Sequence, residues 1–191
     1  MIRSIGLCFT HRRRLGGKSE FHFGPGINVV VGPNGSGKST LLRALHECGE
    51  CNKDQDCVGG IQYFNSESMN PHSRNIPDRS PLGMLLQTRG MFSSHGQIMK
   101  AAMVSLPVRQ GGVLLIDEPE AGQDLASVER LAEGFRKLAD HDVQVVIATH
   151  HPLFFGVGTL IELVPGYAAD LTRKLCTALH CITEQTPYET P

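Results

Sequence analysis

The sequence contains no apolar run of the roughly 18 residues that a membrane-spanning helix needs. Its start, MIRSIGLCFTHRRR, carries its charge after a short apolar stretch and not before one. We therefore expect no signal peptide, no anchor and no direct membrane insertion. Repeats and low-complexity stretches are absent too. With 191 residues, 40% apolar and a mean hydropathy of -0.13, the composition predicts one globular domain, 1–191, and excludes disordered and fibrous classes.

The chain also lacks an excess of charge of either sign. Its formal net charge of -1 gives no global reason to expect a nucleic-acid partner. The charge is unevenly spread, however, because residues 1–43 hold seven of the 18 basic residues and one of the 19 acidic residues. This basic N-terminal part, which includes the run Arg12–Arg14, would either meet phosphates of a nucleotide or nucleic acid, stack on adenine, or form a solvated loop.

Six cysteines without a secretion signal indicate reduced thiols or metal ligands, and therefore a cytoplasmic protein. Cys48-x-x-Cys51 would supply two zinc ligands. The sequence has no second C-x-x-C, which favours free thiols in a polar loop. If zinc binds, the residues available to complete four ligands are His46, Cys57, Cys176 and Cys181.

Buried strands alternate with helical patterns along the chain. Apolar runs predict strands at 27–31, 113–116 and 143–148, and helices are expected at 41–47, 127–140 and 168–180. This order predicts an α/β fold of three layers around a mainly parallel sheet. Strands at 2–8 and 20–23 predict a small N-terminal antiparallel region around a loop at 11–18. The remaining expected elements are strands at 61–64 and 160–164, loops elsewhere in 47–80, and helices at 81–88 and 96–105.

The segment 32–40, GPNGSGKST, fits the phosphate-loop pattern G-x-x-x-x-G-K-[ST] and lies between a buried strand and a helix. Its glycines allow backbone N–H groups to converge on phosphates at the positive end of the helix. Lys38 would neutralise phosphate charge, and Ser39 would ligate Mg²⁺. The candidate nucleotide-binding residues here are Gly32, Asn34, Gly35, Ser36, Gly37, Lys38, Ser39 and Thr40.

Two further strands end in polar residues that would lie beside this loop. The strand at 113–116 leads into Asp117 and Glu118, which would reach Mg²⁺ and an attacking water; alternatively, the two acids cap the next helix. The strand at 143–148 leads into Thr149 and His150. His150 would contact the γ-phosphate or the water with support from Thr149, or else it is structural.

The order of these motifs resembles the ATP-binding cassette (ABC) ATPases. NGSGKSTLLRAL resembles the Walker A motif, LLIDEPEAGQD the Walker B motif with the D-loop, and IATHHP the switch-histidine segment. The resemblance implies a P-loop NTPase fold, ATP and Mg²⁺ as cofactors, ATP hydrolysis by Lys38, Glu118 and His150, and Ser39 and Asp117 as metal ligands. It also implies a reduced helical insertion at about 66–105, inside a single domain.

The segment SSHGQ, 93–97, resembles the family's signature motif LSGGQ and departs from it at two positions. The resemblance implies a head-to-tail homodimer around two ATP molecules. Ser94, Gly96 and Gln97 would then contact nucleotide held by the opposite subunit, and Asp124 would be the D-loop aspartate. Without the neighbouring motifs, SSHGQ would be read as a helix cap. No glutamine follows the strand at 61–64, so Glu67 or Gln62 is the candidate for the Q-loop.

The opening GPGINVVVGPNGSGKSTLLRAL resembles the soluble ATPase heads of SMC, recombination and repair proteins, and FSSHGQ with DEPE resembles small stand-alone bacterial ATPases. This resemblance implies a role in DNA repair, recombination or defence, with a DNA or protein partner. The alternative is the ATP-binding subunit of a membrane transporter, although the stretch between Ser39 and Ser94 is short for one. A nucleotide-holding switch is a third hypothesis, which Glu118 argues against.

Overall fold

The computed structural model describes residues 1–65 and 108–185. In chain order its elements are β1 (Ile2–Gly6), α1 (Phe9–Arg14), β2 (Glu20–His22), β3 (Ile27–Val31), α2 (Lys38–Glu47), β4 (Asn52–Gln55), β5 (Ile61–Asn65), β6 (Val113–Asp117), α5 (Leu125–Asp140), β7 (Gln144–Thr149), the 3-10 helix η1 (Pro152–Phe154), β8 (Thr159–Glu162) and α6 (Tyr167–Gln185). The helices predicted at 81–88 and 96–105 lie outside the described residues.

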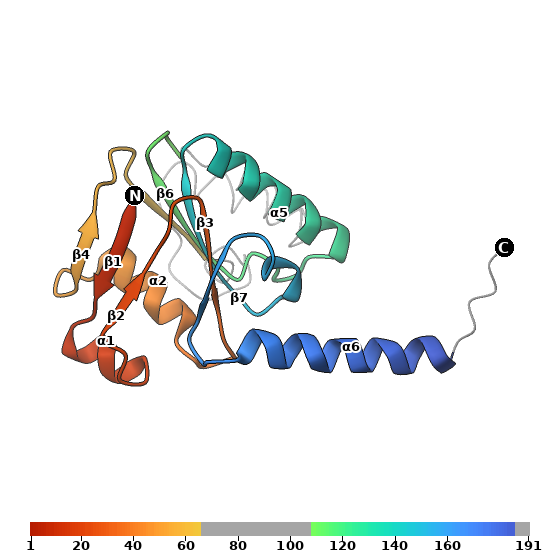
Figure 1. Ribbon diagram of the computed structural model, residues 1–191. Coiled ribbons are helices and arrows are strands. Elements are labelled where there is room, and N and C mark those ends of the chain that lie inside the picture. The colour runs from red at the N-terminus through yellow and green to blue at the C-terminus, as the bar shows by residue number, and fades with distance from the viewer. Residues whose placement is uncertain (66–107, 186–191) are drawn as a thin grey trace.

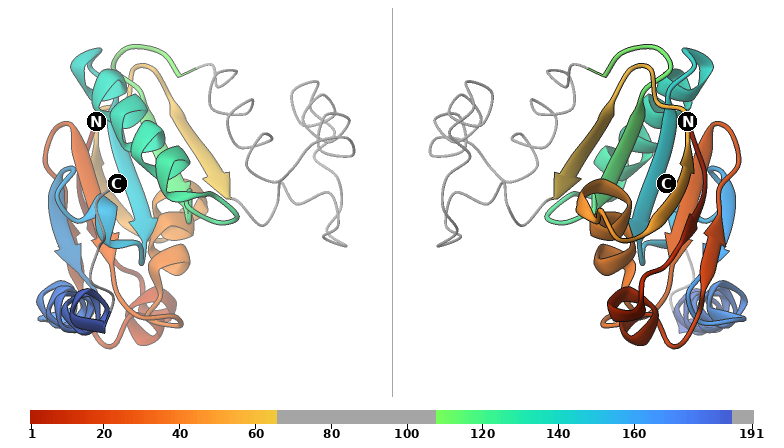
Figure 2. Two further views of the ribbon diagram at one scale, coloured as in Figure 1. Left: turned by 90° about the vertical axis from the view of Figure 1, so that its right-hand side faces the viewer. Right: turned by 90° about the vertical axis from the view of Figure 1, so that its left-hand side faces the viewer.

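A parallel sheet with the strand order β5-β6-β7-β3-β8 forms the centre of the molecule. Its three middle strands, β6, β7 and β3, are buried at every position, as their continuous apolar runs predict. Helix α5 covers one face and α2 the other (Figures 1 and 2). The predicted three-layer α/β fold is therefore confirmed. The strand predicted at 160–164 corresponds to β8, which forms one edge of the sheet.

Alternate side chains of the central strands point to opposite faces and form two cores. Val29 and Ile116 pack with the apolar side of α5, which includes Val128 and Phe135. Val30, Leu115 and Val146 pack instead with α2 and the N-terminal strands. Full burial of each such side chain contributes about 1.5–3 kcal/mol to folding. The two cores therefore hold both helix layers against one sheet.

A second, antiparallel sheet has the order β2-β1-β4. Its first two strands match the predicted antiparallel region. Strand β4 replaces part of the loop expected after residue 47. Its residues, NKDQ, are largely exposed. The segment therefore lacks the apolar alternation that would predict a strand.

Helix α1 corrects the prediction of a loop at 11–18. It begins after its N-cap residue Cys8 and buries none of its own residues, so an apolar period of 3.6 does not appear in its sequence. The run Arg12–Arg14 forms its last turn.

Helix α6 extends away from the rest of the molecule (Figure 1). It is longer than the predicted 168–180, and its residues Leu175 and Leu179 are exposed. Within residues 1–65 and 108–185, none of the helices combines the length and apolar character required to cross a membrane.

The buried side chain of Gln144 joins the two sheets. Its Oε1 accepts from the N–H of Ile2 at 2.6 Å, and its Nε2 donates to the carbonyls of Ile2 and Gly24, each at 2.8 Å. The amide therefore satisfies three backbone groups where β1 meets the start of β7. A buried polar group of this kind stabilises only while all of its partners are present.

We expect Gln144→Leu to reduce the free energy of unfolding by about 2–5 kcal/mol, because the variant leaves buried backbone groups without partners. Urea unfolding followed by circular dichroism measures this loss. Gln55→Leu, at an exposed position of β4, is the control and should change stability little. Equal losses in both variants would show that the amide does not join the sheets energetically.

Candidate functional site

The register of the parallel sheet places three loops at one edge. Val31 of β3 pairs with Thr149 of β7, and Asp117 of β6 pairs with Ala148 of β7. The chain segments that follow β3, β6 and β7 therefore leave the sheet side by side, at the carboxyl edge where parallel sheets bind ligands. They surround a cavity of about 400 Å³. Its lining residues are Asn34, Gly35, Gly37, Lys38, Ser39, Thr40, Glu118 and His150.

The phosphate loop has a conformation that requires glycine. Gly35 and Gly37 have φ values of 78° and 99°, in the left-handed region that L side chains rarely adopt. A β-carbon on Gly37 would lie 2.5 Å from Cδ2 of Leu15, and one on Gly32 would lie 2.5 Å from Oγ of Ser36. The predicted loop therefore needs glycine at these positions, and α2 begins at its end.

Lys38 lies inside this loop and is only 5% exposed. Its Nζ donates to the carbonyls of Gly32 at 3.0 Å and Pro33 at 3.3 Å. These neutral partners satisfy hydrogen bonds without neutralising the charge. An anion that enters the loop would therefore meet an ammonium group together with the N-terminus of α2.

Asp117 is a buried carboxyl with an open coordination position. Its Oδ2 accepts from the hydroxyl of Tyr63 at 3.2 Å, whereas Oδ1 is buried without a hydrogen-bond partner among the described residues. Burial raises the pKa of Asp117, against the lowering effects of Ser39, Tyr63 and Arg43. A buried carboxylate oxygen close to the Ser39 hydroxyl is a donor set that suits Mg²⁺, so these residues fit the expected metal.

Tyr63 is a partner of Asp117 that the sequence did not reveal. Burial and the neighbouring Asp117 raise the pKa of Tyr63 to about 12, so its hydroxyl remains a proton donor at neutral pH. Asn65 ends β5 opposite Asp117, and its Nδ2 donates to the Tyr63 hydroxyl at 3.5 Å. An alternation of Tyr and Asn in a strand that precedes the acidic strand is the only sequence signal for this pair.

Glu118 has an unusual backbone for a non-glycine residue. Its φ is 49°, and its N–H donates to the carbonyl of Ala148 at 2.9 Å. A left-handed conformation of this kind costs about 1–3 kcal/mol and tends to occur at functional sites. The turn places Oε1 of Glu118 3.7 Å from Nδ1 of His150, inside the cavity.

Glu120 positions the histidine and was missed as a site residue. Its Oε1 accepts from the hydroxyl of Thr149 at 2.6 Å and from the N–H of His150 at 3.2 Å. The same oxygen lies 3.5 Å from Nδ1 of His150. Glu120 is 7% exposed, so the chain holds a buried carboxylate behind the imidazole. The sequence signal for this role was the position of Glu120 as the third acid of the motif DEPE.

Some predicted site residues lie elsewhere. Oδ1 of Asp124 accepts from the N–H of Ser127 at 2.7 Å and thereby caps α5, so its D-loop role stays a prediction. Gln62 lies within β5 opposite Leu114, three residues before the end of the strand, and not in the cavity lining. Gly32 and Ser36 shape the loop without lining the cavity. The remaining candidates, Glu67, Ser94, Gly96 and Gln97, are outside the described residues.

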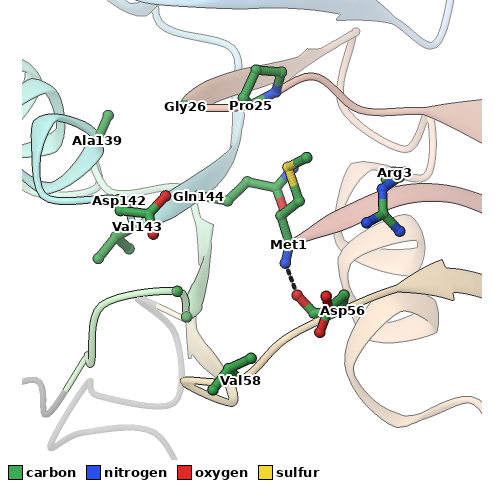
Figure 3. A pocket seen from close by; sticks show the side chains of 12 residues that line it. Met1, Arg3, Pro25, Gly26, Asp56, Val58, Ala139, Asp142, Val143 and Gln144 are labelled. Carbon is green, nitrogen blue, oxygen red and sulfur yellow. Dashed lines mark hydrogen bonds between the residues drawn. The ribbon is translucent and has the colours of Figure 1, made fainter.

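Another cavity, of about 380 Å³, lies at the opposite end of the strands (Figure 3). Met1, Asp56 and Gln144 contribute to its lining, and the amino group of Met1 donates to the carbonyl of Asp56. This is the amino edge of the sheet, remote from the phosphate loop and the acids. It therefore does not compete with the first cavity as the nucleotide site.

Two family models match the chain. Residues 7–48 match the model described as "AAA domain", and residues 95–156 match "AAA domain, putative AbiEii toxin, Type IV TA system". The phosphate import ATP-binding protein PstB 1 of Streptococcus agalactiae serotype III is 28% identical over 91 residues, which cover 48% of this chain and 36% of that protein. PstB 1 of Streptococcus pyogenes serotype M1 is 29% identical over the same shares. These matches support an ABC-type P-loop ATPase.

Solved structures of ABC proteins share the fold of this chain. An ATP-bound bacterial Atm1-family ABC exporter has a TM-score of 0.51 at 18% identity, over 81% of this chain and 36% of that one. "Putative ABC transporter (ATP-binding protein)" from Pyrococcus furiosus has a TM-score of 0.54 at 15% identity, over 85% and 96%. The matched segment spans only about a third of the length of the curated relatives, at 36%.

Burial of the Asp117 carboxylate should lower the stability of the ligand-free domain. We expect Asp117→Asn to raise the melting temperature in EDTA at pH 7.5 by a few degrees, at about 2–4 °C per kcal/mol. A raised folded-state pKa makes the ionised form unfavourable only above the unfolded pKa, so the difference should shrink as pH falls through the folded pKa. Differential scanning calorimetry measures both effects.

The control is Asp56→Asn, because Asp56 is exposed. It should leave the melting temperature nearly unchanged. A lower melting temperature for Asp117→Asn at every pH would show that the charged carboxylate stabilises the fold in spite of its burial.

Proposed function

We propose that this chain binds and hydrolyses ATP with Mg²⁺. The observation that carries the proposal is the convergence of the phosphate loop, Glu118 and His150 on one cavity. Oδ1 of Asp117 is buried without a hydrogen-bond partner among the described residues, and its carboxyl lies close to Ser39 of the same cavity. The family-model matches and the similarity to proteins named as ATP-binding support it. Three different strands lead into these groups. A glycine turn without a function would not explain why all of them meet at one cavity.

Each residue of the cavity then has a distinct role. The loop amides and Lys38 hold the phosphates, and Ser39 with Asp117 holds Mg²⁺, which neutralises charge on the phosphates. Glu118 orients the attacking water or accepts its proton. His150, positioned by Glu120, contacts the γ-phosphate. Phosphoryl transfer depends mostly on positioning and electrostatics, so these residues include the kinds of group that the reaction requires.

A neighbouring cavity is the proposed site for the nucleoside part of ATP. It has a volume of about 330 Å³ and adjoins the phosphate-loop cavity through Thr40, which lines both. Arg14 and Arg43 are among its lining residues, and a planar guanidinium can stack on a base. Of the three interpretations of the arginine run, this location favours adenine stacking for Arg14.

We expect Glu118→Gln to lower kcat by at least about 100-fold, because the amide cannot accept the proton from water. ATP binding should persist, since Lys38 and the loop are unchanged. With turnover blocked, the variant should accumulate as an ATP-bound homodimer. Phosphate release and light scattering at saturating ATP measure the two effects.

The matched control is Glu129→Gln, at an exposed position of α5, which should behave like the unaltered chain. A fully active Glu118→Gln would remove Glu118 from the proposed chemistry. An inactive variant that stays monomeric would instead overturn the head-to-tail dimer.

The proposed dimer requires Ser94, Gly96 and Gln97 to act on nucleotide in the opposite subunit, with Asp124 near the interface. The ATPase rate per subunit should then rise with protein concentration and reach a plateau once dimers dominate. Mixing Ser94→Ala with Lys38→Ala chains, each inactive alone, should restore up to about one active site per mixed dimer, because each chain supplies what the other lacks. A flat, nonzero rate per subunit with no restoration would contradict action in trans.

For the cellular role, we propose a cytoplasmic ATPase of DNA repair, recombination or defence, with DNA or a protein as partner. The resemblance to soluble ATPase heads supports this role. A second candidate is the ATP-binding subunit of a membrane transporter, which the similarity to PstB proteins favours. Copurification with an integral membrane protein would support the transporter role. An ATPase rate that DNA raises, with no membrane protein present, would support the repair role.

A further inference from the structure

Four metal-ligating side chains meet outside the nucleotide cavity. The ligand atoms of Cys8, His11, Cys48 and Cys51 all lie within 4.8 Å of one another. Cys8 precedes α1 and His11 lies in its first turn, whereas Cys48 caps the C-terminus of α2 and Cys51 precedes β4. Two segments about 40 residues apart in the chain therefore supply two ligands each, both pairs with the spacing i, i+3.

The distances within this cluster suit a single tetrahedral ion. Sγ of Cys8 lies 3.1 Å from Nδ1 of His11 and 4.0 Å from Sγ of Cys48, and Sγ of Cys51 lies 3.7 Å from the same Nδ1. A tetrahedral zinc with bonds of about 2.3 Å to sulfur and about 2.0–2.1 Å to nitrogen separates its ligand atoms by about 3.5–3.8 Å. Small side-chain rotations would bring all four atoms to these separations.

We propose that Cys8, His11, Cys48 and Cys51 form a structural Zn²⁺ site. Three thiolates and one imidazole are one of the common ligand sets of structural zinc, and a tetrahedral sulfur-nitrogen set favours zinc over harder cations. The six cysteines are free in the structure, so these three thiols are available as ligands. The site goes beyond the proposed ATPase activity and does not depend on it.

The surroundings of the cluster also suit a bound metal. The N–H of Cys8 points to Sγ of Cys51 at 3.4 Å, and N–H groups directed at thiolate ligands orient them as part of the second coordination shell. Cys51 is 6% exposed, whereas the other three ligands are half-buried. The site is therefore shielded on one side and accessible to an entering ion on the other.

Cys48-x-x-Cys51 was the only ligand pair evident in the sequence, and its expected partners were different. His46 stacks on Tyr63 with ring centroids 5.4 Å apart, Cys57 is not in the cluster, and Cys176 and Cys181 are exposed on α6. The second pair is Cys8-x-x-His11, which a search for cysteine pairs alone does not find.

The zinc would hold α1 beside the nucleotide site. Helix α1 buries none of its own residues, so apolar packing contributes little to its position. Its C-cap residue Leu15 lies directly against Gly37 of the phosphate loop, and His11 and Cys48 line the cavity proposed for the nucleoside. A metal that links α1 to the end of α2 would therefore fix one wall of that cavity.

The first experiment measures zinc by mass spectrometry in the full chain, purified under reducing conditions without added metal. The unaltered protein and the Cys57→Ser and Cys176→Ser controls should each carry about one zinc per chain, and Cys8→Ser and Cys48→Ser at least about tenfold less. A chelator should lower the melting temperature of the unaltered chain and not that of the depleted variants.

Co²⁺ added to metal-depleted protein is the second probe, and it does not depend on activity or on whether a variant folds. An intense tetrahedral Co²⁺ spectrum with thiolate charge-transfer bands, displaced by one equivalent of Zn²⁺, would support the site. A weak octahedral spectrum, equal loss of zinc in the Cys57→Ser control, or a Cys8–Cys48 disulfide in reduced protein would overturn it. Failure of ATP hydrolysis in otherwise zinc-loaded protein would leave this proposal standing and count against the proposed function alone.

Discussion

The site depends on the in-register parallel pairing of β7 with β6 on one side and β3 on the other. This pairing sets Val31 opposite Thr149 and Asp117 opposite Ala148, so the three strands end within one residue of one another at the carboxyl edge of the sheet. A shift of one residue in either pairing would turn every side chain of a strand to the other face, which would exchange the contents of the two cores. The two packed helix layers therefore fix the positions of the chemical groups.

Several buried groups at this edge are poorly satisfied in the domain itself. Oδ1 of Asp117, Oε2 of Glu120 and Oγ of Ser36 are buried without hydrogen-bond partners among the described residues, and Glu118 has a strained backbone. Each feature raises the free energy of the folded state. The apolar packing of α2 and α5 against the sheet offsets this increase. Polar atoms that are left open in this way are ready to bind a ligand without first breaking internal hydrogen bonds.

The parts of the structure that the sequence predicted are those with strong local signals. The run INVVV and the loop GPNGSGKST determine a buried strand and a glycine-dependent turn almost by themselves. Helix α1 and strand β4 carry no apolar periodicity, because α1 buries nothing and β4 lies on an exposed edge. Glu120, Tyr63 and the pair of Cys8 with His11 acquire their roles only through contacts between distant segments, which sequence spacing does not encode.

The Gln144 amide has a consequence for the whole N-terminal sheet. Its hydrogen bonds hold β1 at the amino end of the parallel strands. At the carboxyl end, Leu15, the C-cap residue of the helix that follows β1, contacts Gly37. The antiparallel sheet is therefore attached at both ends of the parallel strands, and Ile2, Ile5 and Phe21 pack it into the core between them. The phosphate loop is thus braced from outside the parallel sheet, by residues that precede it in the chain.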